Sequence, residues 1–558
     1  MSNKSFVILV LVVLAAALGG DRYFAATAKK KTVSERSYPK PLYVRYQTNL
    51  NEEQLLFLAR QQARHTETRD CSLGNIEPGK KGLLTLKRIQ DMKVVEACIK
   101  ALRERGADAG YIYTDDLLEM YGYPRSYAKL DEEPDPITQP ELRLVIEGIQ
   151  HYNFPDFAFS DAAWSKLPQR SHEIVDDARK RYHARNDALK KYLDSHAEYD
   201  YVFVEWFSGG PMVQEMSNLF GRKFRNAWRL PTMESLVRQG TIPQEVWRSL
   251  EQKALVMIPW IRHVHITDPE GTDFQFSLTA EDARYWSMGA FYPDYIRVYP
   301  MQSGRWLFRS LGVKKVVVPQ DARGFIAGTV GHYNTILPHL KLTVERGQVV
   351  KAEGGGLQGY LMEDIRERFK DVHLPYLPAP GWLYVFQLSM PVNPKNGARS
   401  ITWGFGAEIY IPETEKFAAE HKVPITHDFH FENSFPTYEA TVTGGKKEKF
   451  IDRGHLVLLD NPEVRAIASK YGETDEILRE EGARPIPGIN VPGDYWKDYA
   501  QNPGQYWAKQ REERRSGKSP YVVTILPFQL RDLGQPAPPQ QVAHRPSPKE
   551  VLYNLVKR

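Results

Sequence analysis

The pattern of hydrophobic and polar positions predicts alternating helices and strands in the first half of the chain. In residues 91–105 apolar side chains recur at helical spacing and the pattern stops at Gly106, so this segment is predicted to be a helix that ends there. Residues 109–113 read as a short strand, residues 172–193 as a long charged helix, and residues 199–207 as a buried strand. Such alternation favours an α/β domain with a parallel sheet.

Further along, the pattern changes to strands joined by tight turns. Residues 263–276 predict two strands around the turn Asp268-Pro269-Glu270-Gly271, where proline and glycine supply the turn geometry. Three more strands are predicted, at residues 313–319, 340–344 and 349–353. A turn at Arg346-Gly347-Gln348 joins the last two as a hairpin. The second domain is therefore expected to be β-rich.

Length and composition support more than one globular domain. The chain has 558 residues, and this length exceeds what one ordinary hydrophobic core organises. Its hydrophobic content of 42% is typical of globular domains. The predicted regions are a signal peptide at 1–28, a lead-in segment at 29–51, an N-terminal α/β domain at 52–262, a β-rich metal-site domain at 263–455 and a C-terminal extension at 456–558. Because 74 basic residues nearly balance 69 acidic ones, the net charge of +5 gives no case for a nucleic-acid partner.

The N-terminus predicts export to the periplasm or the extracellular space. Lys4 precedes an apolar run at residues 6–18, and Ala26-Thr27-Ala28 fits a small-x-small cleavage site. The run is short for a membrane span, although an uncleaved anchor stays open as the one route to membrane contact. Cys71 and Cys98 lie in the exported part, where they are either joined by a disulfide or buried as free thiols.

The densest set of metal-capable side chains lies at residues 426–432. His427, His430 and Glu432 bring two imidazoles and a carboxylate within six positions, and a His-x-Glu pair on a strand can place a nitrogen and an oxygen on one divalent cation. We therefore predict these three residues as metal ligands. The metal is zinc, cobalt, manganese or iron, which the sequence does not separate. The alternative is a polar strand edge with a buried, hydrogen-bonded histidine.

Two further carboxylates are candidate catalytic bases beside this cluster. In an extended strand Asp428 shares one face with His430 and Glu432, while the intervening phenylalanines point to the other face. A divalent ion with an open position lowers the pKa of bound water to about 7, and Glu408 or Asp428 could then accept its proton. His332 and the two residues after it are candidates to line the same site, or turn residues after a glycine.

Other conspicuous side chains are predicted to be structural. His263 and His265 share a strand face and are expected to pack rather than bind metal. The aromatic pairs Tyr495-Trp496 and Tyr506-Trp507 could stack on a sugar or a partner, but we expect them to pack the extension onto the main body. Residues 511–515 are predicted to be a solvated helix face.

Several segments resemble the thermophilic aminopeptidase T family of metallopeptidases. The similar segments are residues 266–274, 340–352, 404–408, 430–432 and 444–454. In that family a similar hairpin follows an N-terminal α/β domain, and a Gly-rich segment with a glutamate and a His-x-Asp pair fall where Glu408 and His430-Phe431-Glu432 stand here. The resemblance implies a metal-dependent hydrolase that releases N-terminal residues from peptides.

This sequence departs from the family where the first metal-bridging glutamate is expected. Residues 322–329 contain no carboxylate, and Arg323 would repel a cation. The resemblance therefore implies at most one metal ion, and family relatives include a non-haem iron dioxygenase that opens hydroxylated pyridine rings. Three hypotheses follow: a metallopeptidase-like hydrolase, a mononuclear iron dioxygenase, and a non-catalytic binding protein that lost the metal centre. The partner is a peptide or small molecule, and a homodimer stays open.

Overall fold

The N-terminal region forms a small parallel sheet covered by helices. The computed structural model describes residues 36–63, 73–128, 135–144, 160–166, 170–204, 219–220, 224–225, 232–289, 291–292, 295–297, 299, 315–331, 335–395, 401–407, 411–423 and 428–525. Its strands are β2 (Lys81–Leu86), β3 (Asp108–Tyr113), β4 (Tyr201–Phe203) and β5 (Phe224–Arg225), in the order β3-β2-β4-β5 and all parallel. The predicted α/β domain with a parallel sheet is confirmed.

The helices of this region begin and end at residues that suit those positions. They are α2 (Glu52–Gln62), α3 (Met92–Glu104), α4 (Thr114–Met120), α6 (Asp161–Trp164), α7 (Arg170–Ser195), α9 (Met233–Gly240) and α10 (Gln244–Met257). The Asp91 side chain caps α3 by accepting from the Lys93 amide at 3.0 Å, and Gly106 takes a left-handed φ of 78° just after the helix. The predicted helix that ends at Gly106 and the long charged helix are both present.

The second region is a large antiparallel sheet that closes on itself over part of its length. Its strands are β6 (Ile261–Asp268), β7 (Thr272–Ser277), β8 (Phe291–Tyr292), β9 (Tyr295–Arg297), β10 (Arg323–Gly331), β11 (Ile336–Glu345), β12 (Gln348–Gly354), β13 (Tyr384–Pro391), β14 (Ile401–Gly406), β15 (Asp428–Asn433), β16 (Thr437–Val442), β17 (Lys447–Asp452) and β18 (His455–Leu456). The sheet order runs β11-β12-β13-β14-β15-β10, and β10 also pairs with β11, so these strands form a closed barrel. The β-rich prediction is confirmed.

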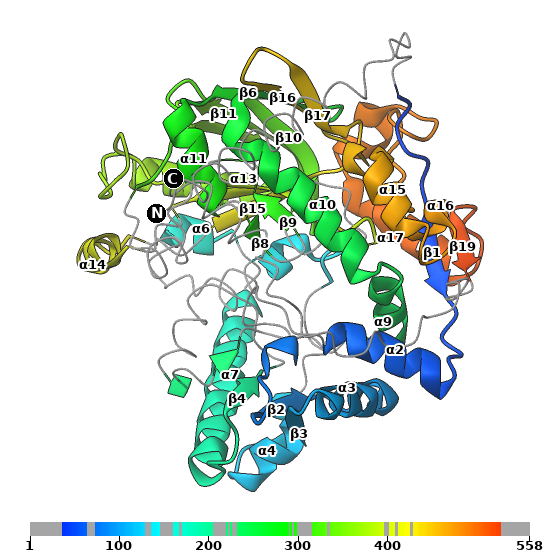
Figure 1. Ribbon diagram of the computed structural model, residues 1–558. Coiled ribbons are helices and arrows are strands. Elements are labelled where there is room, and N and C mark those ends of the chain that lie inside the picture. Colours follow the sequence, from blue (N-terminus) through cyan, green and yellow to red (C-terminus); the bar gives the residue numbers. More distant parts are fainter. Residues whose placement is uncertain are drawn as a thin grey trace, which may run out of the picture. The chain divides into compact units, whose positions relative to one another are not determined.

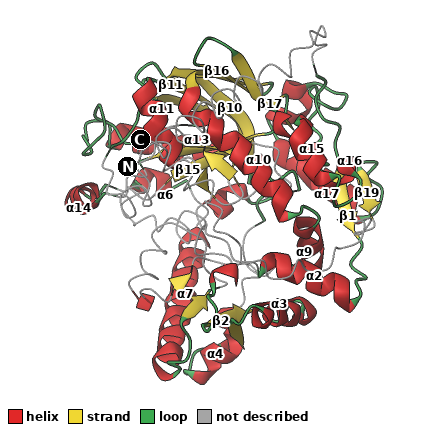
Figure 2. Ribbon diagram, viewed as in Figure 1, coloured by secondary structure: helices red, strands yellow, loops and turns green. Residues whose placement is uncertain are grey.

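The β-rich region and the segment that follows it also contain helices. They are α11 (Ala280–Gly289), α13 (Gly356–Arg368), α14 (Pro412–His421), α15 (Pro462–Ala468) and α16 (Thr474–Ile477). Among these, α13 packs on β11 and β12, while α11 packs on β6, and Figure 2 shows the strands of this region gathered together with helices beside them.

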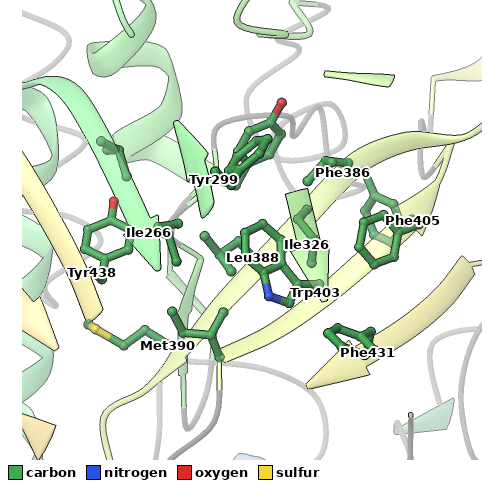
Figure 3. Packing of buried hydrophobic residues seen from close by; sticks show 14 of the residues in the cluster. Ile266, Tyr299, Ile326, Phe386, Leu388, Met390, Trp403, Phe405, Phe431 and Tyr438 are labelled. Atoms are coloured by element: carbon green, nitrogen blue, oxygen red, sulfur yellow. The ribbon is translucent and has the colours of Figure 1, made fainter. Parts of the chain in front are cut away.

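Large aromatic side chains fill the core of the β-rich region. Trp403 is fully buried and packs edge-on against Phe274 with 5.4 Å between ring centroids. Its ring also stacks with that of Phe405 (Figure 3). Its indole N–H donates to Asn433 Oδ1 at 2.6 Å, and the Asn433 amide donates in turn to the Ala327 carbonyl at 2.8 Å. These two hydrogen bonds link β10, β14 and β15 through the buried side chains of Trp403 and Asn433.

The two ends of the described chain meet in a separate two-stranded sheet. β1 (Tyr43–Tyr46) pairs in parallel with β19 (Val522–Ile525), and Figure 1 shows the blue β1 beside the orange-red β19. Along the sequence, α17 (Pro503–Arg515) lies between the last strand of the β-rich sheet and β19. Chain contacts assign all these elements to one unit, Pro39–Arg558, and separate it from Met1–Tyr38.

One strand prediction is wrong and several predictions lie outside the described residues. Within the strand predicted at 313–319, residues 315–319 have no strand assignment; Val317 is buried in the core and Val316 and Val318 pack against it, so apolar burial rather than strand pairing explains their composition. Residues 1–28, predicted to be a signal peptide, and Cys71 lie outside the described residues, whereas Cys98 is a free, buried thiol whose pKa burial raises to about 12. None of the helices that the structure describes is long and apolar enough to cross a membrane.

Candidate functional site

Strand β15 presents two of the predicted metal ligands on one face. Phe429 and Phe431 are buried in the core, while His430 and Glu432 alternate with them and are half-buried. This alternation is the one predicted for an extended segment. Asp428 begins the strand, but its side chain is outside the described residues. His427 and Glu408 are also outside them.

Among the described residues of the strands that flank β15, those opposite this pair carry no imidazole or carboxylate. Gly404 of β14 lies opposite His430, and Thr402 of β14 and Val330 of β10 lie opposite Glu432. Residues directly opposite in an antiparallel pair point to the same face. Within the described part of the chain, no three His, Cys, Asp or Glu side chains come together as a metal-ligand set.

The Glu432 carboxylate is engaged by an arginine. Arg484 Nη2 donates to Glu432 Oε2 at 3.4 Å, and both side chains are largely buried, at 14% and 13% exposed. The Arg484 guanidinium also lies 5.8 Å from the centre of the Trp507 ring. A cation on Glu432 would have to compete with this guanidinium and would be repelled by it. The described residues therefore do not fit a metal ion at Glu432.

Arg484 also lines a cavity of about 580 Å³, which we call the arginine pocket. The described residues that line it are Leu42, Tyr43, Val44, Arg45, Ile137, Arg238, Ile336, Glu481, Gly482, Arg484, Trp507, Arg511, Arg514, Arg515 and Val522. Six of these are arginines and one is a carboxylate. That carboxylate, Glu481, is already paired with Lys395 at 3.2 Å and Arg479 at 3.4 Å.

Helix α17 supplies much of the positive charge of the arginine pocket. Trp507, Arg511, Arg514 and Arg515 stand at helical spacing, so they share one face of the helix. The prediction that residues 511–515 form a solvated face holds for Glu512 and Arg515, which are exposed, and is wrong for Arg511 and Arg514, which are partly buried and line the cavity. Sequence reasoning missed the pocket, although the helical spacing of Trp507 and the arginines was a signal for it.

The guanidinium groups of the arginine pocket are held in place by neighbours. Arg511 Nη1 donates to Asp135 Oδ2 at 2.5 Å, and Arg45 Nη2 donates to the Arg514 carbonyl at 2.6 Å. The Arg514 guanidinium lies 4.2 Å from the centre of the Tyr43 ring, a cation–π contact. These contacts order the arginines before any ligand is present.

A second polar group, buried beneath the C-terminal extension, centres on Glu270 in the turn between β6 and β7. Glu270 is 1% exposed, and its Oε1 accepts from the Thr329 hydroxyl at 2.8 Å and from the Tyr495 hydroxyl at 2.9 Å. Desolvation by burial, helped by the nearby Asp268 carboxyl, raises the pKa of Glu270 well above its usual value. Burial likewise raises the pKa of Asp268, which accepts from the Glu270 and Phe435 amides. The sequence predicted a turn here but not a buried pair of carboxyl groups.

Aromatic residues of the extension join this carboxyl to the arginine pocket. Tyr499 lies 2.9 Å from the Thr329 hydroxyl, and the Trp507 indole N–H donates to the Tyr499 oxygen at 3.0 Å. His339 Nδ1 lies 2.8 Å from the Tyr495 oxygen, and burial lowers the pKa of His339 to about 4. The expected packing of the extension onto the main body is confirmed for Tyr495 and Trp507, which are buried.

The remaining sequence candidates have structural contacts. His263 hydrogen-bonds with Ser277 at 3.0 Å, and His265 with Asp273 at 2.7 Å, in line with the expected packing role. Arg323 is exposed at the start of β10. His332 and the two residues after it lie outside the described residues.

Comparisons with known proteins give a distant structural relation. No family model matches the chain, and a search of curated proteins finds no match. A 2,5-dihydroxypyridine dioxygenase from Pseudomonas putida has 11% identity and a TM-score of 0.35 over 73% of this chain and 98% of that one. AmpT from Thermus thermophilus has 12% identity and a TM-score of 0.34 over 73% of this chain and 100% of that one. These values favour neither activity.

Proposed function

We propose that the protein is a ligand-binding protein that holds a small molecule in the arginine pocket. The observation that carries this proposal is the pairing of Glu432 with Arg484 at the wall of the pocket. A carboxylate that faces a buried guanidinium orients it and offsets its charge. In this account Glu432 positions Arg484 for the cavity. The cavity volume of about 580 Å³ lies within the range of small-molecule sites.

The second candidate is a metal-dependent hydrolase resembling aminopeptidase T, or a mononuclear iron dioxygenase. The observation in its favour is that His430 and Glu432 share one face of β15. Its ligand set would be His430, Glu432 and His427, with Glu408 or Asp428 as the general base. This candidate requires Glu432 to leave Arg484, and it predicts one tightly held ion per chain.

Elemental analysis of the purified full chain separates the two candidates. Ligand binding in the arginine pocket predicts well below one equivalent of any divalent transition metal, and a thermal midpoint that a chelator does not change. The hydrolase or dioxygenase predicts close to one equivalent, lost in His430→Ala. His265→Ala is the matched control, since that imidazole lies on β6 and bonds to Asp273. If the parent protein contains a metal ion that the His430→Ala variant lacks and the His265→Ala variant keeps, the binding proposal is overturned.

A further inference from the structure

We propose that the arginine pocket takes an amphipathic acid, a small molecule with a carboxylate or phosphate group and an apolar body. This inference rests on the proposed ligand-binding function and names the class of ligand. It follows from the charge of the pocket, the way its arginines are held, and the apolar part of its wall.

The pocket concentrates positive charge that its own residues only partly offset. Its six arginines come from β1, α9, α17 and the segment before α17. Two of them have carboxylate partners, because Arg511 pairs with Asp135 and Arg484 with Glu432. The lining carboxylate of Glu481 is paired with Lys395 and Arg479 behind the wall. Like charges in a concave, partly desolvated site repel one another, and a bound anion relieves this repulsion.

Guanidinium groups suit the recognition of carboxylate and phosphate oxygens. Each offers several N–H donors in a planar fork, and charge-assisted hydrogen bonds are stronger than neutral ones. Asp135 holds Arg511 and the Tyr43 ring holds Arg514, so little side-chain freedom is lost when an anion binds to these two. The pocket is therefore preorganised for an acid group near the α17 face.

Much of the remaining wall is apolar, which favours a ligand with an apolar body over a purely ionic one. Its aliphatic side chains come from distant parts of the sequence, namely Leu42, Val44, Ile137, Ile336 and Val522. The rings of Tyr43 and Trp507 complete this surface. Apolar surface of this kind stabilises a ligand by about 25 cal/mol per Å² that it removes from water. A ligand with an apolar body thus gains more from the cavity than an inorganic anion does.

The test is a calorimetric titration of the full chain with probes that share one apolar body. Octanoate and octyl phosphate carry the acid group, octan-1-ol and octylammonium replace it with a neutral and a cationic group, and inorganic phosphate lacks the apolar body. We expect saturable one-site binding of octanoate, octyl phosphate or both, at least about tenfold tighter than octan-1-ol, and no binding of octylammonium. The stronger of the two acids identifies the acid group.

Two arginine variants locate the binding. Arg511→Gln and Arg514→Gln change the two residues of the α17 face at which the acid group is placed. Each is expected to weaken binding of the acid probe by about tenfold, the loss of one charge-assisted hydrogen bond. Arg465→Gln is the control, because that exposed arginine pairs with Asp475 outside the pocket. Circular dichroism and the thermal midpoint report folding of each variant.

The outcomes separate the ligand class from the function. Equal binding of octan-1-ol and octanoate, lost in Trp507→Ala, would keep the binding function and reject the acid class. Binding of inorganic phosphate as tight as octyl phosphate would reject the apolar body. If both arginine variants bind the acid probe as tightly as the parent does, the binding site lies elsewhere and the proposal is overturned. Failure of every probe to bind would also overturn it. A stoichiometric metal dependent on His430 would reject the function itself.

Discussion

Glu270 is a carboxyl group without access to water, so its protonation state is set by its neighbours. The groups that face it are Asp268, Thr329, Arg484, Tyr495 and Tyr499. Burial and Asp268 favour the neutral acid, whereas the two hydroxyl donors and Arg484 favour the carboxylate. The net effect is a pKa raised above its ordinary value, so the protein pays a free-energy cost when Glu270 ionises.

Replacement of Glu270 by glutamine tests this at the residue scale. The folded-state pKa is raised, so the stabilisation is complete below the unfolded-state pKa and is lost as pH rises through the folded-state pKa. We expect the free energy of unfolding of the parent to fall relative to Glu270→Gln above about pH 5, by at most about 1.4 kcal/mol per pH unit for one proton. Urea unfolding from pH 5 to 9 measures it. Parallel curves for the two proteins would contradict the raised pKa.

The meeting of β7 and β10 depends on a glycine. Gly324 has a φ of 132°, and a Cβ built there would lie 2.0 Å from the Asp273 carbonyl oxygen. Asp273 and Phe274 pair with Phe325 and Gly324 across this point, and the pairing joins the barrel to the rest of the sheet. Only a residue without a side chain lets the two backbones approach this closely.

Gly324→Ala should therefore cost more than a substitution that strains only the backbone. We expect a loss of about 3 kcal/mol or more in the free energy of unfolding, because a clash with backbone adds to an unfavourable φ. Gly444→Ala is the control, since Gly444 has a φ of 91° and nothing within 4 Å of its added Cβ. That control should lose about 1 kcal/mol. Equal losses in chemical denaturation would show that the close approach is not what matters.

Elements with local signals could be predicted from sequence, and elements that depend on distant partners could not. The hairpin of β6 and β7 was found because its turn residues carry their own geometry. The pairing of β1 with β19 joins segments more than 450 positions apart in the sequence and leaves no local trace. Residues 315–319 have the composition of a strand but no strand pairs with them.

In the candidate site, too, local features could be predicted from sequence and contacts between distant residues could not. The period of two along β15 was enough to place His430 and Glu432 on one face. The partner of Glu432 was not predictable, because Arg484 lies 52 positions away in the extension. The arginines of α17 were predicted to face solvent because the sequence shows that these side chains are charged but not which groups lie opposite them. Whether a charged helix face meets water or lines a cavity is decided by tertiary packing.

At the scale of the whole molecule, the arginine pocket draws its wall from segments far apart in the sequence. β1, α9, β11, α17 and β19 each contribute lining residues. The extension is tied to the barrel by Tyr495 on Glu270 and by Tyr499 beside Thr329, and Trp507 links that group to the cavity. A ligand in the pocket therefore contacts both ends of the described chain and the extension that joins the second end to the barrel.

The most direct test of this account is the effect of Glu432→Gln on binding of the acid probe. Glutamine keeps the shape of the side chain and an oxygen that can accept from Arg484, but removes a negative charge that competes with the ligand. We predict that calorimetric affinity for octanoate or octyl phosphate stays equal or rises by a few-fold. Loss of acid binding together with loss of a stoichiometric metal ion would contradict the account and make Glu432 a metal ligand.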